Sequence, residues 1–160
     1  MEVIYSVKEL PIDAAVYAFY GGRGAREYVA YVGIANNLRQ RAEQHLIKHD
    51  SSVTTGPSAV KLETQYISKM EWWGDRVLEG IVKREAAELV FSDLLQPVLV
   101  SRGNPRKDSR ELFGNKSFYE SMRNLKEKPS GVLILLTAEE RIQKLEDRIA
   151  YLEEQMNTKR

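Results

Sequence analysis

The feature that most constrains the fold is a pair of tyrosine-bearing segments separated by a glycine-rich turn. Residues 15–20 and 27–34 are rich in Val, Tyr, Phe and Ile, which favour β-strands. The Gly-Gly-Arg-Gly run at 21–24 supplies the positive φ angles that a tight reversal needs. The sequence therefore predicts a β-hairpin. A turn centred on its last glycine places Tyr17 opposite Tyr31, on one face of the sheet.

An amphipathic helix is predicted directly after this hairpin, from about 37 to 48. Asn36 or Asn37 offers an N-cap for it. Arg41 and His45 are four residues apart on this helix, so both side chains can point at one ligand. Apolar residues recur every four positions on an adjacent face and predict the buried stripe, which comprises Leu38, Ala42 and Leu46.

The remaining elements complete a fold of the α/β (α+β) class, with a small antiparallel three-stranded sheet flanked by helices. Residues 49–58 read as a loop, and Val60–Trp73 as the third long strand. Asp75 caps a helix predicted from roughly 76 to 95, which ends before Pro97. Weaker patterns predict short strands at 3–7 and 132–136 and a helix at 117–126. The predicted divisions are a core at 1–100, a basic loop and helix extension at 101–137, and a C-terminal helix at 138–160.

The C-terminal segment carries an apolar seam with the spacing of a coiled coil. Its apolar residues recur at alternating steps of four and three, with charged flanks: Ala138, Ile142, Leu145, Ile149, Leu152 and Met156. About three heptads give only a marginal isolated dimer. We expect a homodimer or higher homo-oligomer through residues 138–160, the alternative being an amphipathic helix that packs on its own domain.

Composition excludes several classes of function. The chain has 160 residues, 42% of them hydrophobic and 29% charged, as expected for one soluble domain with a modest appendage. It has no cysteine, which excludes disulfides, thiolate catalysis and zinc–thiolate sites and fits a reducing cytoplasm. No apolar run reaches the length of a membrane span, and the N-terminus does not resemble a signal peptide, so we expect a cytoplasmic protein without a membrane partner.

Charge distribution is more informative than the net charge of +1. Within residues 101–128, eight basic residues stand against four acidic ones, which predicts a local basic surface, although a solvated charged face is an equal reading. The basic residues are Arg102, Arg106, Lys107, Arg110, Lys116, Arg123, Lys126 and Lys128, and the acidic ones are Asp108, Glu111, Glu120 and Glu127.

The tyrosines of the predicted hairpin, Arg41 and His45 of the following helix, and a later glutamate resemble the GIY-YIG nuclease family in their order and spacing. The resemblance covers about residues 14–97. Ala15-Val16-Tyr17 stands at the first tripeptide of that family and Tyr31-Val32-Gly33 at the second. Arg41 follows Gly33 at the spacing of the family's catalytic arginine, and His45 matches a histidine of several members. Each tripeptide alone is a weak signal, whereas the ordered set of Tyr, Tyr-x-Gly, Arg, His and Glu is much stronger.

This resemblance implies a set of catalytic residues. Tyr17 corresponds to a tyrosine proposed as general base or water-positioning group, and Tyr31 would hydrogen-bond the phosphate or support Tyr17. Arg41 would grip phosphate oxygens, and His45, with a near-neutral pKa, would relay a proton. Glu88, at the family's distance before a proline, would bind Mg²⁺ or Mn²⁺.

Two alternatives stay open at these positions. Glu85 lies about one helical turn from Glu88 and takes its role if the alignment shifts by a turn. The family often carries Asn shortly after the proline, where this chain has Val98-Leu99-Val100, so Asn104 or Asn115 is the candidate replacement.

Gly33 would permit close approach of backbone or phosphate. The candidate substrate-binding residues are Gly33, Arg39, Asn104, Arg102, Arg106 and Lys107.

The function that this resemblance implies is metal-dependent hydrolysis of DNA phosphodiester bonds. A dimeric enzyme of the type II restriction kind would act on double-stranded DNA. The alternatives are a nicking or structure-specific repair nuclease, which would use the same residues, and a nucleic-acid-binding protein whose nuclease fold has lost activity.

Overall fold

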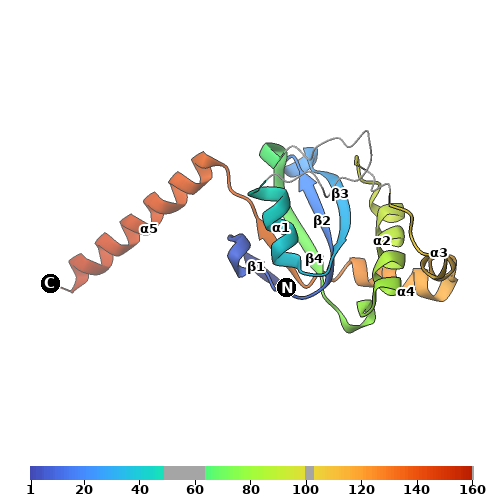
Figure 1. The fold of residues 1–160 in the computed structure, drawn as a ribbon. Coiled ribbons are helices and arrows are strands. Elements are labelled where there is room, and N and C mark those ends of the chain that lie inside the picture. The colour runs from blue at the N-terminus through green and yellow to red at the C-terminus, as the bar shows by residue number, and fades with distance from the viewer. Residues whose placement is uncertain (49–63, 100–102, 160) are drawn as a thin grey trace.

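The sheet of this protein has five strands rather than the three expected. The computed structural model describes residues 1–48, 64–99 and 103–159. The strands lie in the order β1-β5-β4-β2-β3, and Figure 1 shows them as the centre of a mixed α/β domain. Their bounds are Glu2–Ile4 (β1), Ala15–Gly21 (β2), Tyr28–Ala35 (β3), Ile67–Trp73 (β4) and Gly131–Ile134 (β5).

The long strand β2 pairs antiparallel with both β3 and β4, and two short strands extend the sheet beyond the expected three. β5 pairs antiparallel with β4, and β1 pairs parallel with β5. These two strands have four and three residues, too few for their alternation to indicate where they pair. The third strand, expected from Val60, begins at Ile67 in the described part of the chain. Residues 60–63 of the expected strand and the loop expected at 49–58 lie outside the described residues.

The hairpin register differs from the predicted one by two residues. Tyr17 lies opposite Gly33, and Tyr31 lies opposite Phe19. The turn contains a short 3-10 segment at Gly24–Arg26, and a bulge after Phe19 reduces the difference to one residue next to the turn, where Tyr20 lies opposite Val29. Because a shift of two keeps every side chain on its own face, Tyr17 and Tyr31 still share one face of the sheet.

Helices cover both faces of the sheet and create two apolar cores. Helix α1 (Leu38–Leu46) lies on the face that carries Tyr17, Phe19 and Tyr31, and buries Leu38 and Ala42 there. Helix α2 (Ile81–Leu95) covers the other face, where Val90 and Phe91 pack against Val16 and Trp73. Helices α3 (Lys107–Phe113) and α4 (Lys116–Lys126) pack on α2.

Helix α2 begins five residues later than predicted. Asp75 caps a 3-10 turn at Arg76–Leu78 rather than the long helix. Gly80 then adopts a φ of 88°, which a side-chain-bearing residue rarely accepts, and redirects the chain into α2. Gln96, with a φ of 51°, ends the helix in the left-handed conformation.

The segment after α2 returns to the sheet and covers its edge. The backbone amides of Val98 and Leu99 donate to the carbonyl oxygens of Val29 and Ala30, at 3.0 and 2.9 Å. These bonds pair residues 98–99 with the outer side of β3, which limits edge-to-edge association of the sheet.

Helix α5 (Ala138–Thr158) extends away from the rest of the domain (Figure 1). Thr137 and Glu140 form a capping box at its start, which satisfies two of its free amides. Among the residues that the structure describes, no helix combines the length and the apolar character needed to cross a membrane.

Candidate active site

The centre of the candidate site is a hydrogen bond between β2 and α1. The Tyr17 hydroxyl lies 3.0 Å from Nε2 of His45. Helix α1 is held in place for this contact by its Asn37 cap, whose side-chain oxygen accepts from the Gln40 amide at 3.0 Å. Leu38 and Ala42, both fully buried, anchor the same helix to the sheet. His45 therefore reaches the tyrosine across the interface between helix and sheet.

Gly33 makes room for the tyrosine on the neighbouring strand. A Cβ atom at this position would lie 2.6 Å from the Tyr17 hydroxyl oxygen and 2.7 Å from a ring carbon of Tyr31. The sequence analysis expected backbone or phosphate to approach Gly33, whereas the side chains of Tyr17 and Tyr31 occupy this space in the structure. The glycine of the Tyr-x-Gly motif is required by the ring opposite it.

Aromatic rings surround His45 on the sheet side. The ring centroids of Tyr17, Tyr31 and Phe19 lie 5.9, 5.7 and 5.2 Å from that of His45. The sequence analysis did not single out Phe19. Strand alternation could have identified it, because Phe19 follows Tyr17 by two residues and therefore lies on the same face of the sheet.

Burial keeps His45 neutral. Loss of hydration, and then the positive charge of Arg41, lower the pKa of His45 from 6.5 to about 4. The near-neutral pKa expected from sequence was therefore wrong, because the ring is only 5% exposed. Near neutral pH the imidazole is uncharged, so one of its nitrogens can accept a proton.

Burial also holds the proton on Tyr17. Desolvation raises the pKa of its phenol well above 10, with further contributions from Tyr31 and from the negative charge of Glu88, while Arg41 acts to lower it. Both groups are therefore neutral, and the tautomer of His45 decides whether the phenol or the imidazole donates the hydrogen in this bond. Arg41 and Glu88 both act electrostatically on the same hydroxyl, although they come from different helices.

Glu88 is a half-buried carboxylate on α2 that no described residue neutralises directly. Desolvation and the charge of Glu85 raise the pKa of Glu88 to about 7, against the opposing effect of Arg41. Within the described part of the chain, the Glu88 carboxylate accepts no hydrogen bond, and it forms no direct ion pair with Arg41. A carboxylate in this state gains free energy from an added cation.

Glu85, the alternative to Glu88, has a structural role. Its carboxylate accepts hydrogen bonds from the Arg106 amide at 2.9 Å and the Ser109 hydroxyl at 2.8 Å, and it pairs with the Arg106 guanidinium. Partial desolvation opposes its ionisation, but these hydrogen bonds and the charge of Arg106 lower the pKa of Glu85 overall. Glu85 thereby attaches the start of α3 to α2, whereas the Glu88 carboxylate has no such partner among the described residues.

A divalent metal fits this arrangement only as a mostly hydrated ion. Among the described residues there is no group of three or more His, Asp or Glu side chains arranged to hold a metal. Mg²⁺ often binds through one or two carboxylates and retains several waters. Glu88 alone therefore suits Mg²⁺ or Mn²⁺ as the protein ligand, with the remaining coordination from water and a phosphate.

The predicted substrate-binding residues do not gather at one place. Arg39 donates from Nε to the Leu10 carbonyl oxygen at 2.8 Å and so ties α1 to the N-terminal segment. Arg106 is engaged by Glu85. Lys107, the first residue of α3, has an 83% exposed side chain, and Asn104 is exposed. Arg102 lies outside the described residues. Asn115 caps α4 by accepting from the Phe118 amide at 2.9 Å.

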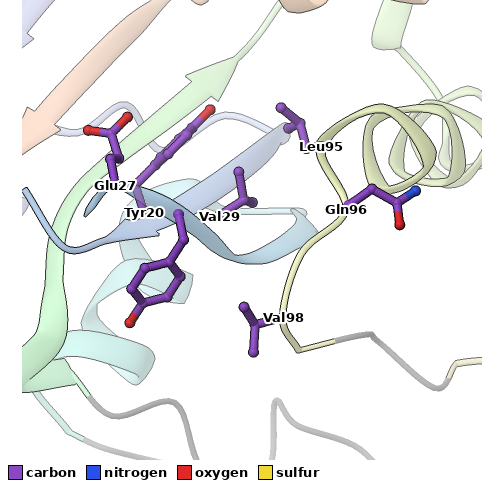
Figure 2. Close-up of a pocket in the computed structure, with 7 residues that line it drawn as sticks. Tyr20, Glu27, Val29, Leu95, Gln96 and Val98 are labelled. Atoms are coloured by element: carbon purple, nitrogen blue, oxygen red, sulfur yellow. The ribbon is translucent and has the colours of Figure 1, made fainter. Parts of the chain in front are cut away.

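An open pocket on another part of the molecule is distinct from this site. It encloses about 340 Å³ between the β2–β3 hairpin and the end of α2. Figure 2 shows its lining side chains, which are mainly apolar, with Glu27 and Gln96 among them. Glu27 pairs with Lys69 at 3.1 Å. His45, Tyr31, Arg41 and Glu88, which act on the Tyr17 hydroxyl, do not line this pocket, so the hollow does not mark the candidate site.

Comparison with known proteins adds no assignment. No protein-family model, no curated protein and no solved structure matches this chain.

Proposed function

We propose that this chain is a metal-dependent endonuclease of the GIY-YIG kind, which hydrolyses DNA phosphodiester bonds. The observation that carries the proposal is the buried hydrogen bond between Tyr17 and a neutral His45. The guanidinium of Arg41 and the carboxylate of Glu88 both act on this pair. Hydrolysis of a phosphodiester requires these functions together: a proton acceptor, a cation for the phosphate and a ligand for a metal.

Each residue then has a defined part in the reaction. Arg41 binds the non-bridging oxygens of the scissile phosphate, since its guanidinium has no ion-pair partner among the described residues. His45 accepts the hydroxyl proton of Tyr17 as the phenol takes up a proton from the attacking water. Tyr31 and Phe19 exclude bulk water from the pair, and Gly33 allows the phenol its position.

Glu88 would hold the metal ion. When bound, Mg²⁺ or Mn²⁺ supplies positive charge to the phosphate and acidifies water at the site. The attraction between the cation and Glu88 would also return the pKa of this carboxyl toward its ordinary value. Ionised Glu88 and Arg41 would then both serve the phosphate, one through the metal and one directly, without pairing with each other.

The substrate class proposed is double-stranded DNA, cut by a homodimer in the manner of a type II restriction enzyme. The exposed basic residues of α3 and α4, such as Lys107 and Lys116, are the candidate backbone contacts. A repair-type nuclease that nicks one strand would use the same site residues. In a protein that binds nucleic acid without cleaving it, these residues would have no catalytic role.

A plasmid cleavage assay with Mg²⁺ or Mn²⁺ tests the proposal. Glu88→Ala and Arg41→Ala are compared with wild type and with the exposed, matched controls Glu79→Ala and Lys48→Ala. We expect loss of at least about a hundredfold in rate for the two site variants and less than about twofold for the controls.

The outcome on different substrates separates the alternatives. Discrete linear products support a double-strand endonuclease, whereas nicked circles or cutting of branched DNA alone support the repair type. Failure to cut duplex, single-stranded or branched DNA with either metal would contradict an endonuclease. Retained DNA binding in that case would favour the inactive, nucleic-acid-binding reading.

A further inference from the structure

Helix α5 leaves its apolar seam open to solvent along its whole length. The seam residues after the first turn are between 47% and 67% exposed: Ile142, Leu145, Ile149, Leu152 and Met156. Figure 1 shows the helix projecting from the domain, so this stripe does not pack on the domain's own core. A 21-residue helix is about 31 Å long and cannot gain most of its stability from propensity alone.

The contacts that hold the start of α5 to the domain use the side of the helix away from the seam. Arg23, in the β2–β3 turn, pairs with Glu140 at 3.1 Å and donates to the Leu135 carbonyl oxygen at 3.2 Å. The Lys144 ammonium lies 3.4 Å from the ring centroid of Tyr5. Because these contacts fix the direction of α5 without covering the seam, the seam is free to meet a partner.

The apolar residues follow the pattern of a parallel two-stranded coiled coil. With Ile142 as the first position of a heptad, the a positions are Ile142, Ile149 and Met156, and the d positions are Ala138, Leu145 and Leu152. Isoleucine at a with leucine at d favours two parallel strands over other arrangements. An ordinary amphipathic helix for a monomeric core needs no such division between branched and unbranched positions.

The flanking charges select the same orientation. Arg141 and Arg148 occupy g positions, and Glu146 and Glu153 occupy the e positions that follow them in the next heptad. In a parallel, in-register pair each of these arginines faces a glutamate of the partner copy. In an antiparallel pair, g faces g and e faces e, so arginine would meet arginine and glutamate would meet glutamate. All four side chains are exposed and available.

We propose that α5 binds a second copy of this chain as a parallel, in-register coiled coil, with Arg141–Glu146 and Arg148–Glu153 pairs on both sides of the seam. The orientation and register follow from α5 alone and do not depend on the nuclease function. Both domains then lie at the same end of the coil, because each chain enters α5 from β5.

Sedimentation of the full chain between about 1 and 200 μM tests the association. The charge-reversal variant Glu146→Arg/Glu153→Arg places four like-charged pairs across the seam. The matched control Asp147→Arg/Glu154→Arg makes the same change in charge one residue along, at the outward f positions. We expect the reversal to weaken association at least about tenfold and the control to change it less than about twofold.

The absence of native cysteine allows the orientation to be measured directly. In a parallel pair, Ala138→Cys and Met156→Cys variants each form disulfide-linked dimers on their own under mild oxidation. In an antiparallel pair, neither cross-links alone, but a mixture of the two does, because these positions are symmetric about the middle of the seam.

The proposal is overturned by any of three results. These are a monomeric wild-type chain over the whole concentration range, equal weakening by the f-position control, and cross-linking only in the mixture. None of these results bears on whether the chain cleaves DNA, so a failed coiled coil and a failed nuclease remain distinguishable.

Discussion

At the scale of single residues, burial determines the chemistry available to Tyr17 and His45. The same loss of hydration that raises the pKa of the phenol lowers that of the imidazole. The pair is therefore locked in its neutral form, with the hydrogen on the tyrosine oxygen. Sequence could place the two residues near each other, but it could not show this state, since burial depends on how α1 packs on the sheet.

His45 should not titrate in the range usual for histidine. With a pKa of about 4, its ring proton resonances should stay constant from pH 8 to about pH 5.5. In the unfolded chain His45 has a pKa of about 6.5, so the contribution of its neutral ring to folding stability is fully present above that pH. This contribution, on the order of 3 kcal/mol, is lost as the pH falls toward 4.

An NMR titration of the two histidines measures this directly. A midpoint near 6.5 for the resonance that His45→Gln removes would contradict the buried, neutral histidine.

Gly33→Ala should disrupt the site without introducing a polar or charged group. The new methyl group would overlap the Tyr17 hydroxyl and the Tyr31 ring. We expect a loss of about 1–3 kcal/mol of folding stability. Gly74→Ala is the control, since its Cβ would meet no atom closer than 3.9 Å.

Chemical denaturation of the two variants gives the comparison. Equal stability of both glycine variants would show that the strand relaxes around the added methyl group. In that case Gly33 would not be needed to position Tyr17.

At the scale of elements, α2 separates two carboxylates by function. Glu85 and Glu88 are three residues apart, yet Glu85 attaches α3, whereas the charge of Glu88 raises the pKa of Tyr17 and the charge of Arg41 acts to lower the pKa of Glu88. Sequence spacing left both open, because either fits the distance to Pro97 within one helical turn. The contact between Glu85 and Arg106 favours Glu88 as the carboxylate of the proposed site, and it joins residues that are distant in sequence.

The two glutamine variants should therefore change stability in opposite directions. The folded-state pKa of Glu88 is raised to about 7, so its ionisation costs folding free energy that is absent below pH 4.5 and complete above about pH 7. At pH 8, Glu88→Gln should stabilise the protein by on the order of 2 kcal/mol. Glu85→Gln should destabilise it by about 1–3 kcal/mol, because its charged hydrogen bonds are lost.

Thermal unfolding at pH 8 and pH 4.5, with and without Mn²⁺, tests both signs. Added metal should raise the melting temperature of wild type and of Glu85→Gln but not of Glu88→Gln. Destabilisation by Glu88→Gln at pH 8 would assign it a structural role.

The elements themselves were predicted with unequal success, and the reasons are physical. The β2–β3 hairpin and helix α1 follow from strong local patterns, and helix α4 from a weaker one. The five-stranded sheet and the hairpin register do not, because short strands and a bulge are settled by pairing with distant segments. Helix α3 was missed since its seven residues lack an apolar period and depend on Glu85 for their start.

At the scale of the whole molecule, the parallel coil and the proposed nuclease together predict how a plasmid is cut. A homodimer presents two sites at the same end of the coil, so both DNA strands should be cut in one binding event. Wild type should convert supercoiled plasmid to linear product with little nicked intermediate. Glu146→Arg/Glu153→Arg should accumulate nicked circles, because its single sites act one at a time.

Gel analysis over the time course measures this ratio, with Asp147→Arg/Glu154→Arg as the control. Identical product ratios for dimeric wild type and the weakened variant would show that the two sites act independently.

The exposed seam of α5 has a consequence for mixtures of chains. A chain with an intact α5 and a defective Glu88 would still assemble with active copies. If both strands require both sites, such a chain would act as a dominant-negative subunit, since most active copies would have an inactive partner when the defective form is in excess. Reversal of the e-position charges in the defective chain would prevent mixed dimers and relieve the inhibition. This result would distinguish inhibition through mixed dimers from simple competition for DNA.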